Sequence, residues 1–117
     1  MSCLAFFGLV LKASAQVWNP DNPGHVEEYI IYVAGKEGIP VGEALAIARC
    51  ESRMNPKALN SKGEYSVGIF QINLKYHNLT LEEAYNPFRN IGYAMDLYLR
   101  EGWKPWQNCY KQISKVV

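Results

Sequence analysis

Apolar residues in the first half of the chain recur with the period of an α-helix, and the pattern ends abruptly at Asn55-Pro56. The first apolar stretch is spaced i, i+3, i+4, i+7 and i+8, and it consists of Val26, Tyr29, Ile30, Val33 and Ala34. This spacing predicts an amphipathic helix that follows an irregular lead-in over residues 16–25 and ends near Gly38. A second helix is expected over about residues 41–53, because the residue before a proline disfavours the helical conformation.

The middle of the chain, residues 56–78, has a different composition. Turn-forming residues alternate there with short apolar pieces, which predicts either a small hairpin or an irregular loop. Helical signals return at Thr80, which is spaced to form a capping box with Glu83. Asn86-Pro87 then provides a cap followed by proline at the first position of the next helix.

The helix that begins at Pro87 is expected to end at Gly102 and to turn four apolar residues inward, namely Phe88, Ile91, Met95 and Leu99. A last helix is expected from Lys104 onward and contains Cys109. We find no repeats and no interdomain linker, and a length of 117 residues fits one domain. The sequence therefore predicts a mainly α single domain with a small irregular or hairpin insert.

The N-terminus reads as a secretory signal. An apolar run, MSCLAFFGLVL, is too short to span a bilayer and is followed by Ala13-Ser14-Ala15, a small-x-small cleavage site. Residues 1–15 are therefore expected to be a signal peptide and residues 16–117 the mature domain. A buried N-terminal helix or a short membrane anchor is the alternative, because no positive charge precedes the apolar run.

The cysteines agree with export. Cys3 would leave with the signal, so Cys50 and Cys109 remain as a pair that can form a disulfide in an oxidising compartment. The alternative is two unpaired buried thiols. No metal-ligand spacing occurs, because His25 and His77 lie far apart, and neither histidine is near a cysteine. The net charge is +1 without blocks of like charge, so no nucleic-acid partner is indicated.

One carboxylate occupies a position where the helical pattern calls for an apolar residue. At 100° per residue, Glu51 falls on a single stripe with Ala44, Ile47, Ala48 and Met54. Desolvation and the carbonyl-rich end of the helix would both raise its pKa. A glutamate that keeps its proton near neutral pH is suited to general acid catalysis. The alternative is that Glu51 reaches water or pairs with a nearby arginine, for which the candidates are Arg49, Arg53 and Arg89.

The residues around Glu51 resemble a known signature. The segment ESRMNPKALNS over residues 51–61, followed by SVGIFQIN over residues 66–73, resembles the motif of lytic transglycosylases of the SLT (soluble lytic transglycosylase) type. The similarity covers roughly residues 26–110 and includes Asn90-Ile91-Gly92 and a Trp-x-x-Trp ending. These enzymes belong to the lysozyme-like superfamily and cleave peptidoglycan glycan strands. The resemblance implies a lysozyme-like α+β fold.

The resemblance also implies roles for individual residues. Glu51 matches the single catalytic acid/base, which would cleave the bond between N-acetylmuramic acid and N-acetylglucosamine and form a 1,6-anhydro ring. The Ala-Tyr-Asn-Ala-Gly segment of larger members is absent, so Tyr93 is our candidate for the tyrosine that commonly faces the catalytic glutamate. The full set of expected substrate-binding residues is Ser52, Ser66, Gly68, Gln71, Asn73 and Tyr93.

Two other functions stay open at this point. A hydrolytic muramidase needs a second carboxylate. Ser66 stands where lysozymes of the chicken type carry an aspartate, which leaves Glu64 as the candidate unless it is an exposed loop acid. A non-catalytic glycan-binding module is the third reading.

The expected partners follow from this resemblance and from the charge and residue spacing described above. They are peptidoglycan strands, without nucleic acid, metal or cofactor. The expected protein is an exported, periplasmic or extracellular monomer, and a secretion, conjugation or phage assembly is a further partner suggested by the family.

Overall fold

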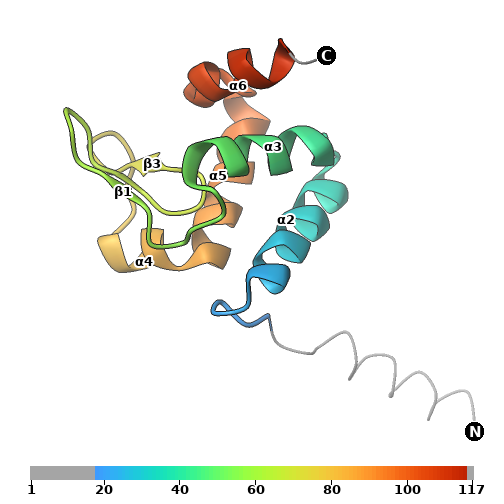
Figure 1. Ribbon diagram of the computed structural model, residues 1–117, viewed down its shortest axis with the longest axis horizontal. Coiled ribbons are helices and arrows are strands. Elements are labelled where there is room, and N and C mark those ends of the chain that lie inside the picture. The colour runs from blue at the N-terminus through green and yellow to red at the C-terminus, as the bar shows by residue number, and fades with distance from the viewer. Residues whose placement is uncertain (1–17, 116–117) are drawn as a thin grey trace, which may run out of the picture.

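The computed structural model describes residues 18–115, so the predicted signal peptide over residues 1–15 lies outside the described residues. Figure 1 shows a helical body with a small lobe of strands at one side. The elements, in chain order, are α2 (Pro23–Glu37), α3 (Val41–Ser52), β1 (Leu59–Asn60), β2 (Ser66–Val67), β3 (Ile72–Asn73), α4 (Leu81–Tyr85), α5 (Pro87–Glu101), the 3-10 helix η1 (Lys104–Trp106) and α6 (Gln107–Ser114). The predicted class, a mainly α single domain with a small insert, is confirmed.

The first helix begins earlier than the apolar spacing predicted. α2 starts at Pro23, inside the stretch that we expected to be an irregular lead-in. The Asn22 side chain accepts hydrogen bonds from the backbone N–H groups of Gly24 and His25, and proline at the first helical position gives up no needed donor. The helix ends as predicted at Gly38, whose left-handed φ of 72° suits a residue without a side chain.

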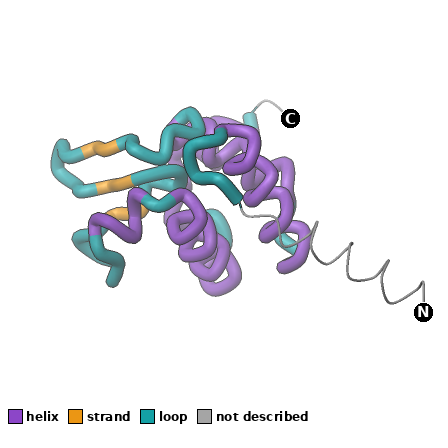
Figure 2. The backbone as a smooth tube through the Cα atoms, turned by 90° about the horizontal axis from the view of Figure 1, so that it is seen from below, coloured by secondary structure: helices purple, strands orange, loops and turns teal. Residues whose placement is uncertain are grey.

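The insert after α3 is a three-stranded antiparallel sheet in the order β1-β2-β3, with two residues in each strand. Leu59 pairs with Val67, and Ser66 pairs with Asn73. This settles the choice between a hairpin and an irregular loop in favour of paired strands. Figure 2 shows the strands connected by long loops in the lobe beside the helices.

The caps predicted for α4 and α5 are both present. Thr80 and Glu83 form the reciprocal capping box, and Asn86 caps Pro87–Glu101. The expectation that Leu99 faces inward is wrong, because its side chain is 52% exposed. Over eight residues the helical period rotates Leu99 by about 80° from Ile91, and Leu97 takes the last core position instead.

The body is held by one core beneath α2, α3 and α5. Its members are buried apolar side chains from all three helices and from the segment between β2 and β3, together with Trp103 and Trp106. Phe70 packs against Trp106 with ring centroids 5.9 Å apart, and the Trp106 indole N–H donates to the Phe70 carbonyl at 2.8 Å. The core therefore links the sheet lobe to the C-terminal helices. Within residues 18–115, no helix is long and apolar enough to cross a membrane.

A disulfide joins Cys50 at the end of α3 to Cys109 in α6, with Cα atoms 5.9 Å apart. The pairing predicted from the sequence is present, and the alternative of two free thiols is wrong. Because this bond spans 59 residues of chain, it restricts the unfolded state strongly.

We expect removal of this disulfide to lower the free energy of unfolding by about 4 kcal/mol. The measurement is urea denaturation of the wild-type protein and of the Cys50→Ala/Cys109→Ala variant. Reductant should lower the wild-type midpoint and leave the variant's midpoint where it was. Equal midpoints for the oxidised protein and the variant would show that the disulfide does not stabilise the fold.

Candidate active site

The last turn of α3 carries Glu51 to the surface of the core. Ala44, Ile47 and Ala48 are completely buried on one face of this helix. Glu51 continues that face and is half-buried. We expected Met54 to continue this stripe, and that prediction is wrong. The helix α3 ends at Ser52, and Met54 has a left-handed φ of 62°. Glu51 is therefore the last residue of the stripe, and it lies where the buried face of α3 ends.

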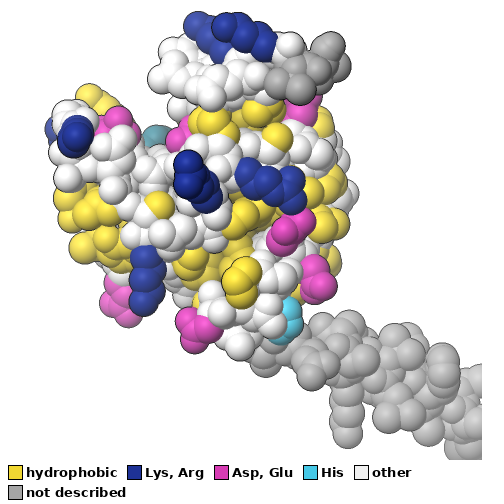
Figure 3. Space-filling model, viewed as in Figure 1, with side chains coloured by type: hydrophobic (Ala, Val, Ile, Leu, Met, Phe, Trp, Pro, Cys, Tyr) yellow, Lys and Arg dark blue, Asp and Glu magenta, His cyan; other side chains and the backbone are white. Residues whose placement is uncertain are grey.

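Glu51 lines a cleft of about 420 Å³ that lies between the sheet lobe and the C-terminal helices. The space-filling view shows the molecule hollowed between the lobe and α6 (Figure 3). The sheet side of the cleft is lined by Asn60, Glu64, Ser66, Gln71, Ile72, Asn73 and His77. The helical side is lined by Glu51, Leu97, Lys104, Pro105, Trp106, Gln107, Asn108 and Cys109.

The environment of Glu51 favours its protonated form. Burial, and to a smaller extent the nearby carboxylate of Glu64, together raise the pKa of Glu51 from 4.5 to about 7. The predicted alternative of an arginine partner is wrong for Arg49, which pairs with Glu27 at 2.8 Å, and for Arg89, which pairs with Glu83. Within the described part of the chain, no ion pair reaches Glu51. A large fraction of Glu51 is therefore uncharged at neutral pH.

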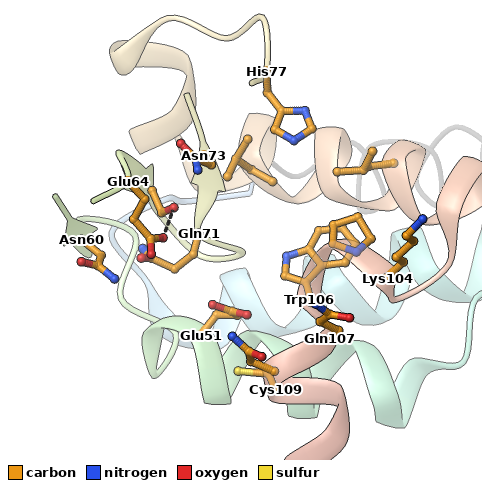
Figure 4. A pocket seen from close by; sticks show the side chains of 15 residues that line it. Glu51, Asn60, Glu64, Gln71, Asn73, His77, Lys104, Trp106, Gln107 and Cys109 are labelled. Atoms are coloured by element: carbon orange, nitrogen blue, oxygen red, sulfur yellow. Dashed lines mark hydrogen bonds between the residues drawn. The ribbon is translucent and has the colours of Figure 1, made fainter. Parts of the chain in front are cut away.

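Glu64 faces the same cleft from the loop before β2. Its side chain is half-buried, and its Oε1 accepts a hydrogen bond from the Ser66 hydroxyl. The reading of Glu64 as an exposed loop acid is therefore wrong. In Figure 4 the Glu64 and Glu51 side chains project into the cleft from different elements.

Three of the predicted substrate-binding residues line the cleft. Gln71 has a left-handed φ of 51°, and its amide group donates to the carbonyls of Ala58 and Gly68, both at 3.1 Å. Asn73 Oδ1 accepts from the backbone N–H of Lys75 at 3.1 Å. Ser66 is buried on β2, where its hydroxyl binds Glu64. These side chains are held by the lobe before any ligand arrives.

The other three predicted residues, Ser52, Gly68 and Tyr93, do not line the cleft. Ser52 is buried, and its hydroxyl donates to the carbonyl of Ile69 at 2.7 Å, which ties the end of α3 to the sheet lobe. The Tyr93 hydroxyl lies 3.0 Å from Nδ1 of His77, so Tyr93 contacts a residue that lines the cleft. Substrate binding by Ser52 and Tyr93 therefore stays a prediction.

Gly68 packs closely against other parts of the protein. A Cβ atom at this position would lie 2.4 Å from the Ala84 carbonyl and 2.5 Å from Asn90 Nδ2. Its φ of 81° is also a left-handed conformation that glycine adopts readily. Close packing of the lobe on Ala84 and α5 therefore requires a glycine here, and substrate binding by Gly68 stays a prediction.

Asn90, which the sequence analysis named as part of the resemblance without giving it a role, is a positioning residue. It is fully buried, accepts from the N–H of Phe70 at 2.8 Å, and donates to the carbonyls of Val67 and Ala84 at 2.9 Å. The sequence signal for this role is a polar residue on the otherwise apolar face of α5. His77, to which the sequence analysis gave no role, lines the cleft as well.

Within residues 18–115, no group of histidine, cysteine, aspartate and glutamate side chains is arranged to hold a metal ion. The polar side chains that line the cleft include two carboxyl groups, those of Glu51 and Glu64, and several amides. A half-buried protonated carboxyl group can donate a proton, and a fixed carboxylate nearby can stabilise positive charge.

A family model described as a lysozyme-like domain matches residues 29–108. This range begins within α2 and ends in α6, so it includes Glu51, the whole sheet lobe and α5. No curated protein and no solved structure matches the chain.

Proposed function

The chain belongs to the lysozyme-like domain family of the SLT type, and on this premise we propose that it is a peptidoglycan lytic transglycosylase with Glu51 as its single acid/base. The family supports a glycan-cleaving function on peptidoglycan. The observation that carries the finer proposal is the half-buried Glu51, whose pKa of about 7 leaves a proton available in the cleft at neutral pH.

The proposed reaction has two proton transfers. Glu51 first donates its proton to the glycosidic oxygen between N-acetylmuramic acid and N-acetylglucosamine, and the bond from this oxygen to the anomeric carbon breaks. The resulting carboxylate then takes the proton of the muramic 6-hydroxyl, whose oxygen bonds to the anomeric carbon. Glu51 ends protonated again, and no water is consumed. One residue serves both steps because its protonation state inverts between them.

The remaining predicted residues take different roles in this proposal. Gln71 and Asn73 line the cleft with polar groups suited to sugar hydroxyl and acetamido groups. Ser52 fixes the end of α3 through Ile69 and so positions the adjacent Glu51. Tyr93 supports His77 on the sheet side of the cleft.

A hydrolytic muramidase is the second candidate, and the position of Glu64 favours it. A hydrolase of this kind uses a second carboxylate as the base or nucleophile, and Glu64 lines the same cleft as Glu51. The two reactions differ in the fate of the muramic 6-hydroxyl, so their products have different masses.

We expect digests of peptidoglycan by the protein to contain 1,6-anhydromuramic ends, lighter by one water than the products of hydrolysis. The measurement is mass spectrometry of the soluble fragments, with a digest by a hydrolytic muramidase run in parallel. Fragments with reducing muramic ends, identical in mass to those of the hydrolase, would contradict the transglycosylase and support the second candidate.

The setting of the reaction follows from its substrate. Peptidoglycan lies outside the cytoplasmic membrane, and a disulfide is typical of exported proteins. We therefore place the activity in the periplasm or outside the cell. A monomer acting beside a secretion, conjugation or phage assembly remains our proposal for its context.

A further inference from the structure

Two carboxyl groups enter the cleft from different parts of the fold. Glu51 comes from the end of α3, and Glu64 comes from the loop that joins β1 to β2 (Figure 4). The Cys50–Cys109 disulfide ties the α3 end to α6, and strand pairing holds the ends of the loop. Because neither carboxyl group stands on a free terminus, their separation is set by the fold.

Ser66 fixes the side chain of Glu64. The serine is only 2% exposed and sits on β2, where it pairs with Asn73 of β3 and Asn60 of β1. Its hydroxyl group donates to Glu64 Oε1. The oxygens of a carboxylate accept such bonds and also carry its negative charge. The bond holds the negative charge of Glu64 at the cleft and keeps the side chain from swinging out toward solvent.

Few other charges face Glu51. Of the side chains that line the cleft, His77 after β3 and Lys104 in η1 are the other titratable groups. The α6 residues that line it, Gln107 and Asn108, are uncharged. Glu64 is therefore the one acidic neighbour of Glu51 among the cleft-lining residues.

We propose that Glu64, held by Ser66, is a positioning residue that acts through Glu51, because its fixed negative charge keeps the proton on Glu51 until the glycosidic oxygen takes it. This inference rests on the proposed role of Glu51 as the acid. Two nearby carboxyl groups disfavour the doubly ionised state, so one of them retains its proton to a higher pH. The effect of Glu64 on the pKa of Glu51 has this direction.

The test is the pH dependence of kcat/KM for the wild-type protein and the Glu64→Gln variant. Glutamine can still accept the Ser66 hydrogen bond but carries no charge. The alkaline limb of the profile, where Glu51 loses its proton, should move down by about half a pH unit to one unit. Activity at pH 8 relative to pH 5 should fall about threefold to tenfold. The matched control is Glu28→Gln, an exposed glutamate of α2 outside the cleft, which should leave the limb in place.

A second variant and a direct readout separate the possible outcomes. Ser66→Ala should move the limb in the same direction but less far, because Glu64 keeps its charge and loses its anchor. The carboxyl resonance of Glu51, followed by NMR without substrate, should shift in parallel in both variants. An unchanged Glu51 titration in Glu64→Gln would overturn the positioning role, even if Glu51→Gln is inactive and the proposed function stands. Loss of activity at every pH in Glu64→Gln would overturn it too, and would make Glu64 a catalytic group, as in the hydrolase.

Discussion

Replacing Glu51 with glutamine is expected to reduce the rate of glycan cleavage at neutral pH by about 100-fold to 10,000-fold, the range that general acid catalysis contributes. Glutamine has nearly the same shape, so the cleft and its amides should still bind glycan. The measurement is release of soluble fragments from purified peptidoglycan, together with binding of the variant to insoluble glycan. A non-catalytic binding module would show equal release, at background level, for the variant and the wild type.

The same substitution should change stability in a pH-dependent way. Because the folded-state pKa of Glu51 is raised from 4.5 to about 7, the wild-type residue contributes its full stability below pH 4.5. That contribution is lost as the pH rises through about 7. Glu51→Gln should therefore be more stable than the wild type at pH 8 by about 1–3 kcal/mol, allowing for the solvent exposure of the site. The difference should disappear at pH 4, and Glu28→Gln should show no such trend.

Replacing Asn90 with alanine is expected to lower the free energy of unfolding by about 3–5 kcal/mol. The side chain is fully buried and satisfies the Phe70 N–H and the carbonyls of Val67 and Ala84. Alanine leaves all three groups without partners in the core and creates a small cavity. Urea denaturation with the disulfide intact measures the loss.

The matched control for Asn90 is Asn78→Ala, an exposed asparagine after β3, which should change stability by less than about 0.5 kcal/mol. Glycan cleavage by Asn90→Ala should also fall under conditions in which the variant is folded, because the Phe70–Gln71 segment lines and supports the cleft. If Asn90→Ala is no less stable than Asn78→Ala, Asn90 does not hold the sheet lobe on α5.

The helical part of this fold could be predicted because its signals are local. Caps at Thr80 and Asn86 and the stop at Gly38 depend on residues within one turn, and the structure has all of them. The predictions for Met54 and Leu99 were wrong for different reasons, since Met54 lies beyond the end of α3 and Leu99 lies within α5 but on its exposed side. The backbone turns left-handed after Ser52, and at the end of α5 Leu97 takes the inward position that Leu99 was expected to fill.

The candidate site could be predicted only in part, for the same reason. Glu51 was identified because one helix and one motif suffice to place it. Gly68 and Ser52 were assigned to substrate because their actual partners, Asn90 and Ile69, are distant in sequence. The position of Glu64 depends on the loop between β1 and β2. A loop has no regular period, so its sequence does not predict the direction of a side chain.

Everything proposed for the reaction depends on the protonation of Glu51, which can be observed directly. The measurement is an NMR titration of the Glu51 side-chain carboxyl carbon in the folded protein, with Glu51→Gln used to assign the resonance. We predict a midpoint near pH 7. A midpoint close to the ordinary glutamate value of about 4.3 would mean that Glu51 is ionised at neutral pH, and it would contradict its role as the proton donor.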